Sequence, residues 1–125
     1  MTTRTRTRTR TLPRAQQSTV HLGPHRAAWL ADRAEAAGCS RGAALLALWP
    51  RDPAGGLLCP RPRHPRAPMP LAVRGLAREG LPAVVTLNGP GWADVAEGIL
   101  SAVAAKGWTL SAVARAVIDD HLEGT

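Results

Sequence analysis

Acid–base and metal-binding residues are few in this chain, and their spacing does not favour catalysis. The four histidines are scattered, at His21, His25, His64 and His121. The two cysteines, Cys39 and Cys59, show no metal-ligand spacing, and no second pair lies near Cys59 and His64 to complete a tetrahedral zinc site. No Gly-rich phosphate loop occurs, and only Asp119-Asp120 stand out as paired carboxylates. We therefore expect no enzymatic activity, no metal and no cofactor.

Arginine is the residue type whose number and placement do indicate chemistry, namely phosphate binding. Residues 1–80 hold fourteen arginines and four acids, a net charge of +10, whereas residues 81–125 hold two cations and five acids, a net charge of −3. A basic front half is typical of a chain that binds a polyanion, most often nucleic acid. The alternative explanation is compositional, because a GC-rich gene also produces an Arg-, Ala-, Gly- and Pro-rich protein.

The composition predicts a soluble, cytoplasmic protein. Two cysteines do not staple a chain of 125 residues, so a reducing compartment is expected. The Thr-Arg repeats at the N-terminus have no apolar stretch behind them, which argues against a signal peptide. The longest apolar run, Ala43 to Trp49, is too short to cross a bilayer, so no membrane partner is expected.

Two segments are predicted to lie outside the regular elements. Residues 1–17 begin with Thr-Arg repeats that have no apolar face to bury, and we predict a disordered basic arm. Residues 50–82 are crowded with Pro and Arg. Because Pro lacks an N–H donor and fixes φ, this segment is predicted to be a linker, with one short helix that ends at Gly80.

The remaining residues form two blocks with the same plan, a first block of residues 18–49 and a second block of residues 83–125. Each block opens with alternating apolar and polar residues, which predicts a strand with one buried face. The apolar strand residues are Val20, Leu22, Val85 and Leu87. Each strand is followed by Gly-Pro, an amphipathic helix, a glycine, and a hydroxyl residue suited to cap a second helix. The chain is therefore predicted to contain an internal repeat.

Two short motifs carry a resemblance to a known family. They are TVHL with GCSR in the first block, at residues 19–22 and 38–41, and VTLN with GWTL in the second, at residues 85–88 and 107–110. A short strand, a helix and then G-x-S/T at the start of a second helix resembles the ribbon-helix-helix family of DNA-binding proteins. The resemblance implies that two strands pair into a ribbon that enters the DNA major groove. One block alone is too small to bury a core. The fold expected is therefore mainly α with a two-stranded antiparallel ribbon, as a tandem ribbon-helix-helix pseudo-dimer.

The same resemblance assigns contacts with double-stranded DNA to particular residues. Base reading is expected from the outward strand residues Thr19, His21, Thr86 and Asn88, since Asn pairs with adenine and Thr contacts base edges or thymine methyls. Phosphate contacts are expected at the starts of the second helices and along the arm. The phosphate candidates are Ser40, Arg41, Thr109, Arg4, Arg6, Arg8, Arg10 and Arg14. The plainer explanations are solvent-facing strand residues, ordinary helix caps and a solubilising tail.

Three functions stay open at the level of the sequence. The first is sequence-specific DNA binding, as a bacterial or plasmid-type transcriptional regulator or a relaxosome accessory factor. The second is an antitoxin of the same fold, in which the linker would wrap the toxin. The third is a helical protein-interaction module with no DNA role, whose acidic second half binds a basic partner. Self-association of pseudo-dimers is also open, as is whether the two blocks pair within one chain or between two.

Overall fold

The computed structural model describes residues 17–64, 66–76 and 78–123. Its elements follow in the order β1 (Gln17–His21), α1 (Pro24–Ala37), α2 (Arg41–Leu48), β2 (Val84–Asn88), α3 (Pro90–Ala105) and α4 (Leu110–Glu123). The described part of the chain is thus mainly α with one two-stranded antiparallel sheet. This confirms the expected combination of helices with a two-stranded antiparallel ribbon. Within the same ranges, no helix has the length and apolar character needed to cross a membrane.

The two strands pair with each other inside a single chain. Thr19 lies opposite Thr86 and Val20 lies opposite Val85, in antiparallel register. The prediction that the segments near residues 18–23 and 83–88 pair is therefore confirmed. Strand β1 begins at Gln17, one residue inside the segment assigned to the arm, so that assignment was too long by at least this residue. The extension follows the strand register, which continues to Gln17 opposite Asn88, the last residue of β2.

A repeated Gly-Pro corner turns each strand into the helix that follows it. Gly23 and Gly89 have φ angles of 83° and 86°, a region that residues with a Cβ rarely adopt. Pro24 and Pro90 then open α1 and α3. Proline suits this first helical position, because its missing N–H would have no partner within the helix. The same dipeptide therefore sets the same corner in both blocks.

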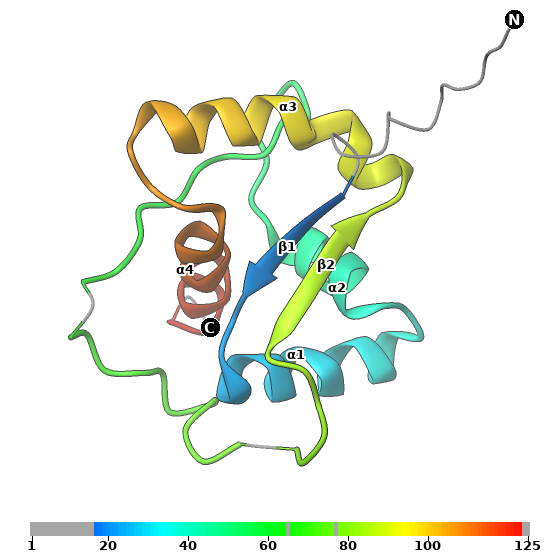
Figure 1. The fold of residues 1–125 in the computed structure, drawn as a ribbon, viewed down its shortest axis with the longest axis vertical. Coiled ribbons are helices and arrows are strands. Elements are labelled where there is room, and N and C mark those ends of the chain that lie inside the picture. Colours follow the sequence, from blue (N-terminus) through cyan, green and yellow to red (C-terminus); the bar gives the residue numbers. More distant parts are fainter. Residues whose placement is uncertain (1–16, 65, 77, 124–125) are drawn as a thin grey trace, which may run out of the picture.

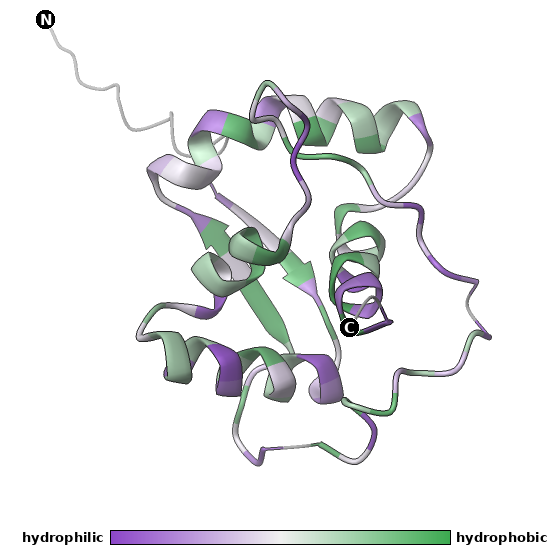
Figure 2. Ribbon diagram, turned by 180° about the vertical axis from the view of Figure 1, so that it is seen from behind, coloured by the Kyte–Doolittle hydropathy of each residue, from purple (hydrophilic) through white to green (hydrophobic). Residues whose placement is uncertain are grey.

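The helices cover one face of the ribbon and leave the other face open. Helix α2 lies behind the strands in Figure 1 and in front of them in Figure 2, while α1 and α3 lie at opposite ends of the ribbon. In Figure 2 the hydrophobic colour concentrates on β2, α3 and the first half of α4. The largest fully buried side chains come from both blocks and include Leu22, Leu30, Leu45, Leu87, Trp92, Ile99 and Ile118. The two blocks therefore share one core.

The blocks are interlocked, because the second helix of each block packs on the strand of the other. Helix α2 contacts β2, and α4 contacts β1. The approach of α2 is very close at Gly42, where a Cβ atom would overlap the carbonyl oxygen of Thr86. A glycine at this place in the first turn of α2 therefore lets the helix lie directly against the strand.

The interlocked helices also hydrogen-bond to the outer edges of both strands at the end formed by His21 and Val84. Arg41 of α2 donates from Nη2 to the carbonyl of Val84 at 3.2 Å. On the other edge, the backbone N–H of His21 donates to Ser111 Oγ at 2.9 Å, and Arg115 Nη1 donates to the carbonyl of His21 at 2.7 Å. Strand edges that are paired in this way are protected from pairing with another chain.

The segment between α2 and β2 has no regular helix or strand over its described residues, as predicted for a linker, yet it is packed on the helices. Trp49 Nε1 donates to the carbonyl of Leu58 at 2.8 Å, and Val73 is fully buried. Arg63 forms ion pairs with Asp120 and Glu123 at the end of α4. In Figure 1 this segment runs around the outside of α4 on its way to β2. It is therefore a docked strap and not a free spacer.

The short helix expected before Gly80 is absent from the described residues of that segment. Residues 71–75 form turns, and Gly75 takes a φ of 78° that interrupts any helix. Leu71 is 78% exposed while Val73 is buried. The segment is held instead by single contacts, including the ion pair of Arg78 with Glu35 on α1 at 2.9 Å.

Candidate nucleic-acid interface

The open side of the ribbon, which we call the outer face, is a two-column array of side chains. Alternate strand residues point the same way, and residues that pair across the strands share a face. The register therefore places three facing pairs on the outer face, namely Gln17 with Asn88, Thr19 with Thr86, and His21 with Val84. Four of the six, Gln17, Thr19, His21 and Asn88, are exposed, and the other two are half-buried. The outer face is thus polar and open to solvent, with Val84 as its one apolar member.

All four residues predicted to read bases lie together on this face. Thr19, His21, Thr86 and Asn88 come from segments far apart in the chain, and strand pairing brings them into one array. Gln17 belongs to the same array but was missed, because it was assigned to the arm. The alternation of the strand could have found it, since it lies two residues before Thr19.

The helix starts beside the ribbon are capped as predicted. Ser40 Oγ accepts from the backbone N–H of Ala43 at 3.1 Å, and Thr109 Oγ1 accepts from that of Ala112 at 3.1 Å. Because α2 packs on β2 and α4 packs on β1, the positive ends of these two helices flank the outer face on its two sides. The other N–H groups of a first helical turn have no partner inside the helix and are available to an anion.

A hollow of about 400 Å³ joins the start of α2 to the outer face of β2. Its lining residues are Ser40, Arg41, Gly42, Pro82, Val84, Val85, Thr86 and Asn88. It therefore brings two of the predicted base readers next to two of the predicted phosphate contacts. Base readers and phosphate contacts must be neighbours in this way if a ribbon is to lie in a groove between two phosphate backbones.

Arg41 has a structural role that sequence reasoning missed. Its guanidinium donates to the carbonyls of Pro82 at 2.9 Å and Val84 at 3.2 Å. Two of the five N–H donors of the guanidinium are thus engaged with the backbone leading into and forming β2. The charge stays at the rim of the hollow, so Arg41 both holds the strand and contributes positive potential there.

Three of the five acids of the second block are paired with arginines of the same chain. Asp119 is buried and accepts two hydrogen bonds from Arg26 of α1, at 2.8 Å each. Asp120 and Glu123 pair with Arg63, and these contacts raise the pKa of Arg63, chiefly through the hydrogen bond that Arg63 donates to Asp120. No Asp or Glu occurs in either strand or in the first turns of α2 and α4. Most of the negative charge of residues 81–125 is therefore paired within the chain, and none of it is carried by the ribbon itself.

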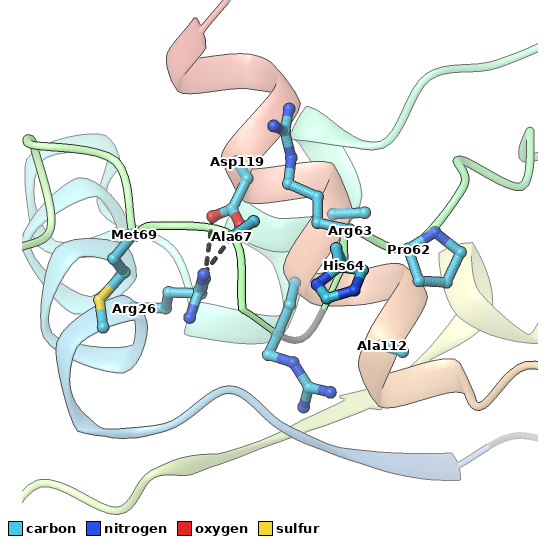
Figure 3. A pocket seen from close by; sticks show the side chains of 10 residues that line it. Arg26, Pro62, Arg63, His64, Ala67, Met69, Ala112 and Asp119 are labelled. Carbon is cyan, nitrogen blue, oxygen red and sulfur yellow. Dashed lines mark hydrogen bonds and ion pairs between the residues drawn. The ribbon is translucent and has the colours of Figure 1, made fainter.

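A larger cavity of about 610 Å³ lies between the strap, α1 and α4 (Figure 3). Arg26, Arg63 and Arg115 line it. Each guanidinium already has a partner in the chain: the carboxylate of Asp119, the acids at the end of α4, and the carbonyl of His21. The arginines around this cavity thus hold α4 to α1, to the strap and to β1.

Cysteine and histidine do not gather elsewhere in the part of the chain that the structure describes. Within residues 17–64, 66–76 and 78–123, no group of three or more metal-ligating side chains occurs. Cys39 is exposed and Cys59 is half-buried, and both are free thiols. Burial raises the pKa of the Cys59 thiol above its ordinary value, which makes it a poor nucleophile.

The remaining predicted phosphate contacts cannot be placed. Arg4, Arg6, Arg8, Arg10 and Arg14 lie outside the described residues. Comparison of the chain with protein-family models, with curated proteins and with solved structures finds no match. The geometry of the outer face is therefore the evidence that bears on function.

Proposed function

We propose that this chain is a tandem ribbon-helix-helix pseudo-dimer that binds duplex DNA sequence-specifically, with its outer face in the major groove. The observation that carries the proposal is the interlocked pairing of two like blocks. Strands of five residues from each block form the ribbon, and the second helix of each block packs on the strand of the other. Two-stranded ribbons of this kind are known readers of DNA grooves.

The dimensions of the outer face suit a major groove. Paired strands lie about 4.8 Å apart, and a groove about 12 Å wide admits such a ribbon. The first and last outward positions of a strand are four residues apart, which is about 13 Å at roughly 3.3 Å per residue. This length matches about four base-pair steps at about 3.4 Å each. The three facing pairs therefore cover a short run of consecutive base pairs.

The side-chain chemistry supports base reading. Asn88 and Gln17 offer amides that pair with adenine, and Thr19 and Thr86 offer hydroxyl and methyl groups for base edges and thymine. The capped starts of α2 and α4 on either side offer N–H groups to the two phosphate backbones. The arm would add sequence-independent affinity through its arginines.

Within this class we propose a bacterial or plasmid-type transcriptional regulator or relaxosome accessory factor. The interaction-module alternative depended on the acidic second half, but three of its five acids pair with arginines of the same chain. The antitoxin alternative depended on the strap as a toxin-wrapping segment, and Arg63 and Arg78 of the strap are engaged with α4 and α1. No observation favours either alternative over DNA binding.

The test is binding to duplex DNA, first to random sequence over a salt series and then by footprinting on the DNA that flanks the gene of this protein. We expect log K to fall linearly with log salt on random DNA, and a protected site in the flanking DNA. Asn88→Ala is expected to weaken the protected site by about 1–3 kcal/mol and to leave random DNA nearly unchanged. Ser101→Ala, an exposed residue on α3, is the matched control and is expected to change neither.

Two results would count against the proposal. If the chain does not bind duplex DNA at low salt, the DNA-binding function is wrong. If it binds, but Asn88→Ala and His21→Ala retain full preference for the protected site while folding normally, the outer face is not the reader.

A further inference from the structure

The two ends of the outer face carry different side chains. At one end Gln17 faces Asn88, so two carboxamides lie side by side, and we call this the amide end. At the other end His21 faces Val84, so an imidazole lies beside an apolar side chain. Between them Thr19 faces Thr86, and only this central pair consists of identical residues. The array is therefore directional along its length.

We propose that each chain binds DNA in a single orientation, on a site that is not palindromic, with the amide end over A·T base pairs. This inference rests on the proposed DNA-binding function and concerns the kind of site. A ribbon made by two copies of one chain has identical ends and reads the same bases at both. Here one covalent chain supplies both strands, so the two ends of the ribbon stay chemically different in every molecule.

The chemistry of the two ends assigns different bases to them. Asn and Gln are the side chains that pair in bidentate fashion with the N6 and N7 atoms of adenine. Paired residues of an antiparallel ribbon have Cα atoms about 5 Å apart, so the two amides reach the same or adjacent base pairs. At the far end Val84 can offer only apolar contact, which suits a thymine methyl group, and His21 offers a single ring nitrogen at a time. Strong adenine preference therefore belongs to the amide end alone.

The hydrogen bonds at the outer edges of the strands also differ between the two ends. The side-chain hydrogen bonds at the ribbon edges gather at the end away from the amides, where Arg41 holds Val84 while Ser111 and Arg115 hold His21. These contacts fix the backbone at the His21–Val84 end. Gln17 and Asn88 are both exposed, so their amides are free to reach bases.

The position of the arm in the sequence also distinguishes the amide end from the other end of the ribbon. Residues 1–16 immediately precede Gln17, so the arginines of the arm join the ribbon at its amide end. Since one chain has one arm, its arginines precede the ribbon at the amide end and not at the other.

Selection from a pool of randomised duplexes, with the full chain as bait, tests the proposal. We expect an enriched motif that differs from its own reverse complement, with A·T pairs at one end. Gln17→Ala and Asn88→Ala are each expected to relax preference at that end by about 5- to 150-fold. His21→Ala is expected to relax only the opposite end, by less. Ser101→Ala serves as the matched surface control and is expected to return the parent motif.

A gain-of-function variant keeps the test independent of any loss of folding. Replacing His21→Asn and Val84→Gln together places an amide pair at both ends, and we expect adenine preference to appear at the second end and the motif to approach a palindrome. A palindromic motif for the parent chain, or equal relaxation of both ends by Gln17→Ala, would overturn the inference while leaving DNA binding intact. Binding without any enriched motif would overturn it too. A lack of duplex binding would instead overturn the proposed function and the inference with it.

Discussion

The contact between Gly42 and β2 leads to a sharp prediction about stability. A methyl group at Gly42 would overlap the carbonyl oxygen of Thr86, lie 3.4 Å from the carbonyl carbon of the same residue and lie 3.7 Å from Cα of Leu87. All three atoms belong to the backbone of a paired strand, so none can swing aside as a flexible side chain would. Gly42→Ala is therefore expected to push α2 away from β2.

The magnitude can be estimated against a matched glycine. An unstrained carbon–oxygen contact is about 3.3–3.6 Å, so helix and strand must separate by on the order of 1 Å to accept the methyl group. Overpacking of this kind costs about 1–3 kcal/mol. Gly98 lies inside α3 with no atom within 4 Å of a Cβ, and Gly98→Ala should stabilise the fold by about 0.5–1 kcal/mol through helix propensity. Because both substitutions gain propensity, their difference isolates the overpacking cost at Gly42.

The assay is equilibrium urea unfolding followed by tryptophan fluorescence, since Trp49 and Trp92 are buried. We expect Gly98→Ala to be more stable than Gly42→Ala by about 1–3 kcal/mol, with similar m values. Gly42→Ala is also expected to weaken DNA binding, because α2 and the outer face of β2 share the hollow at Ser40. If Gly42→Ala proves as stable as Gly98→Ala, the close packing of α2 on β2 is wrong.

Three other outcomes are expected. Asp119→Ala leaves the mostly buried Arg26 unpaired and should lower the free energy of urea unfolding by about 3–5 kcal/mol. Replacing both residues with apolar ones should restore most of this stability. If Asp119→Ala is as stable as the parent, the buried ion pair is wrong. At about pH 8, iodoacetamide should alkylate the exposed Cys39 faster than Cys59, because the raised pKa of Cys59 leaves less thiolate. The difference between the two alkylation rates should narrow as the pH rises. Faster labelling of Cys59 would refute its burial. Deleting residues 2–11 removes four arginines and should flatten the slope of log K against log salt by up to about 3.6, while an unchanged slope would show that the arm does not touch DNA.

The elements that depend on a few neighbouring residues were predictable from the sequence. The alternation around Val20 and Val85 predicted two strands with one buried face, and these residues pair in the structure. Ser40 and Thr109 were predicted as helix caps, and each accepts from the N–H three residues later. Such features are local, because alternation and capping are satisfied by residues two to four positions apart. The prediction of a short helix before Gly80 was wrong, because Gly75 takes a φ of 78° that interrupts a helix.

The tertiary structure decided which distant residues meet. Arg26 and Asp119 are 93 residues apart in the chain, and no local pattern marks either as the partner of the other. No local pattern marks Gly42, and only the packing of α2 on β2 shows why a side chain is excluded there. Likewise the alternation of the strand could place Gln17 on the outer face, but only the register showed that it lies opposite Asn88. The sequence by itself determined the strands, corners and caps, because their energies arise within one turn or one strand. Pairing, the buried ion pair and the direction of the ribbon arise from contacts between segments that only the folded chain brings together.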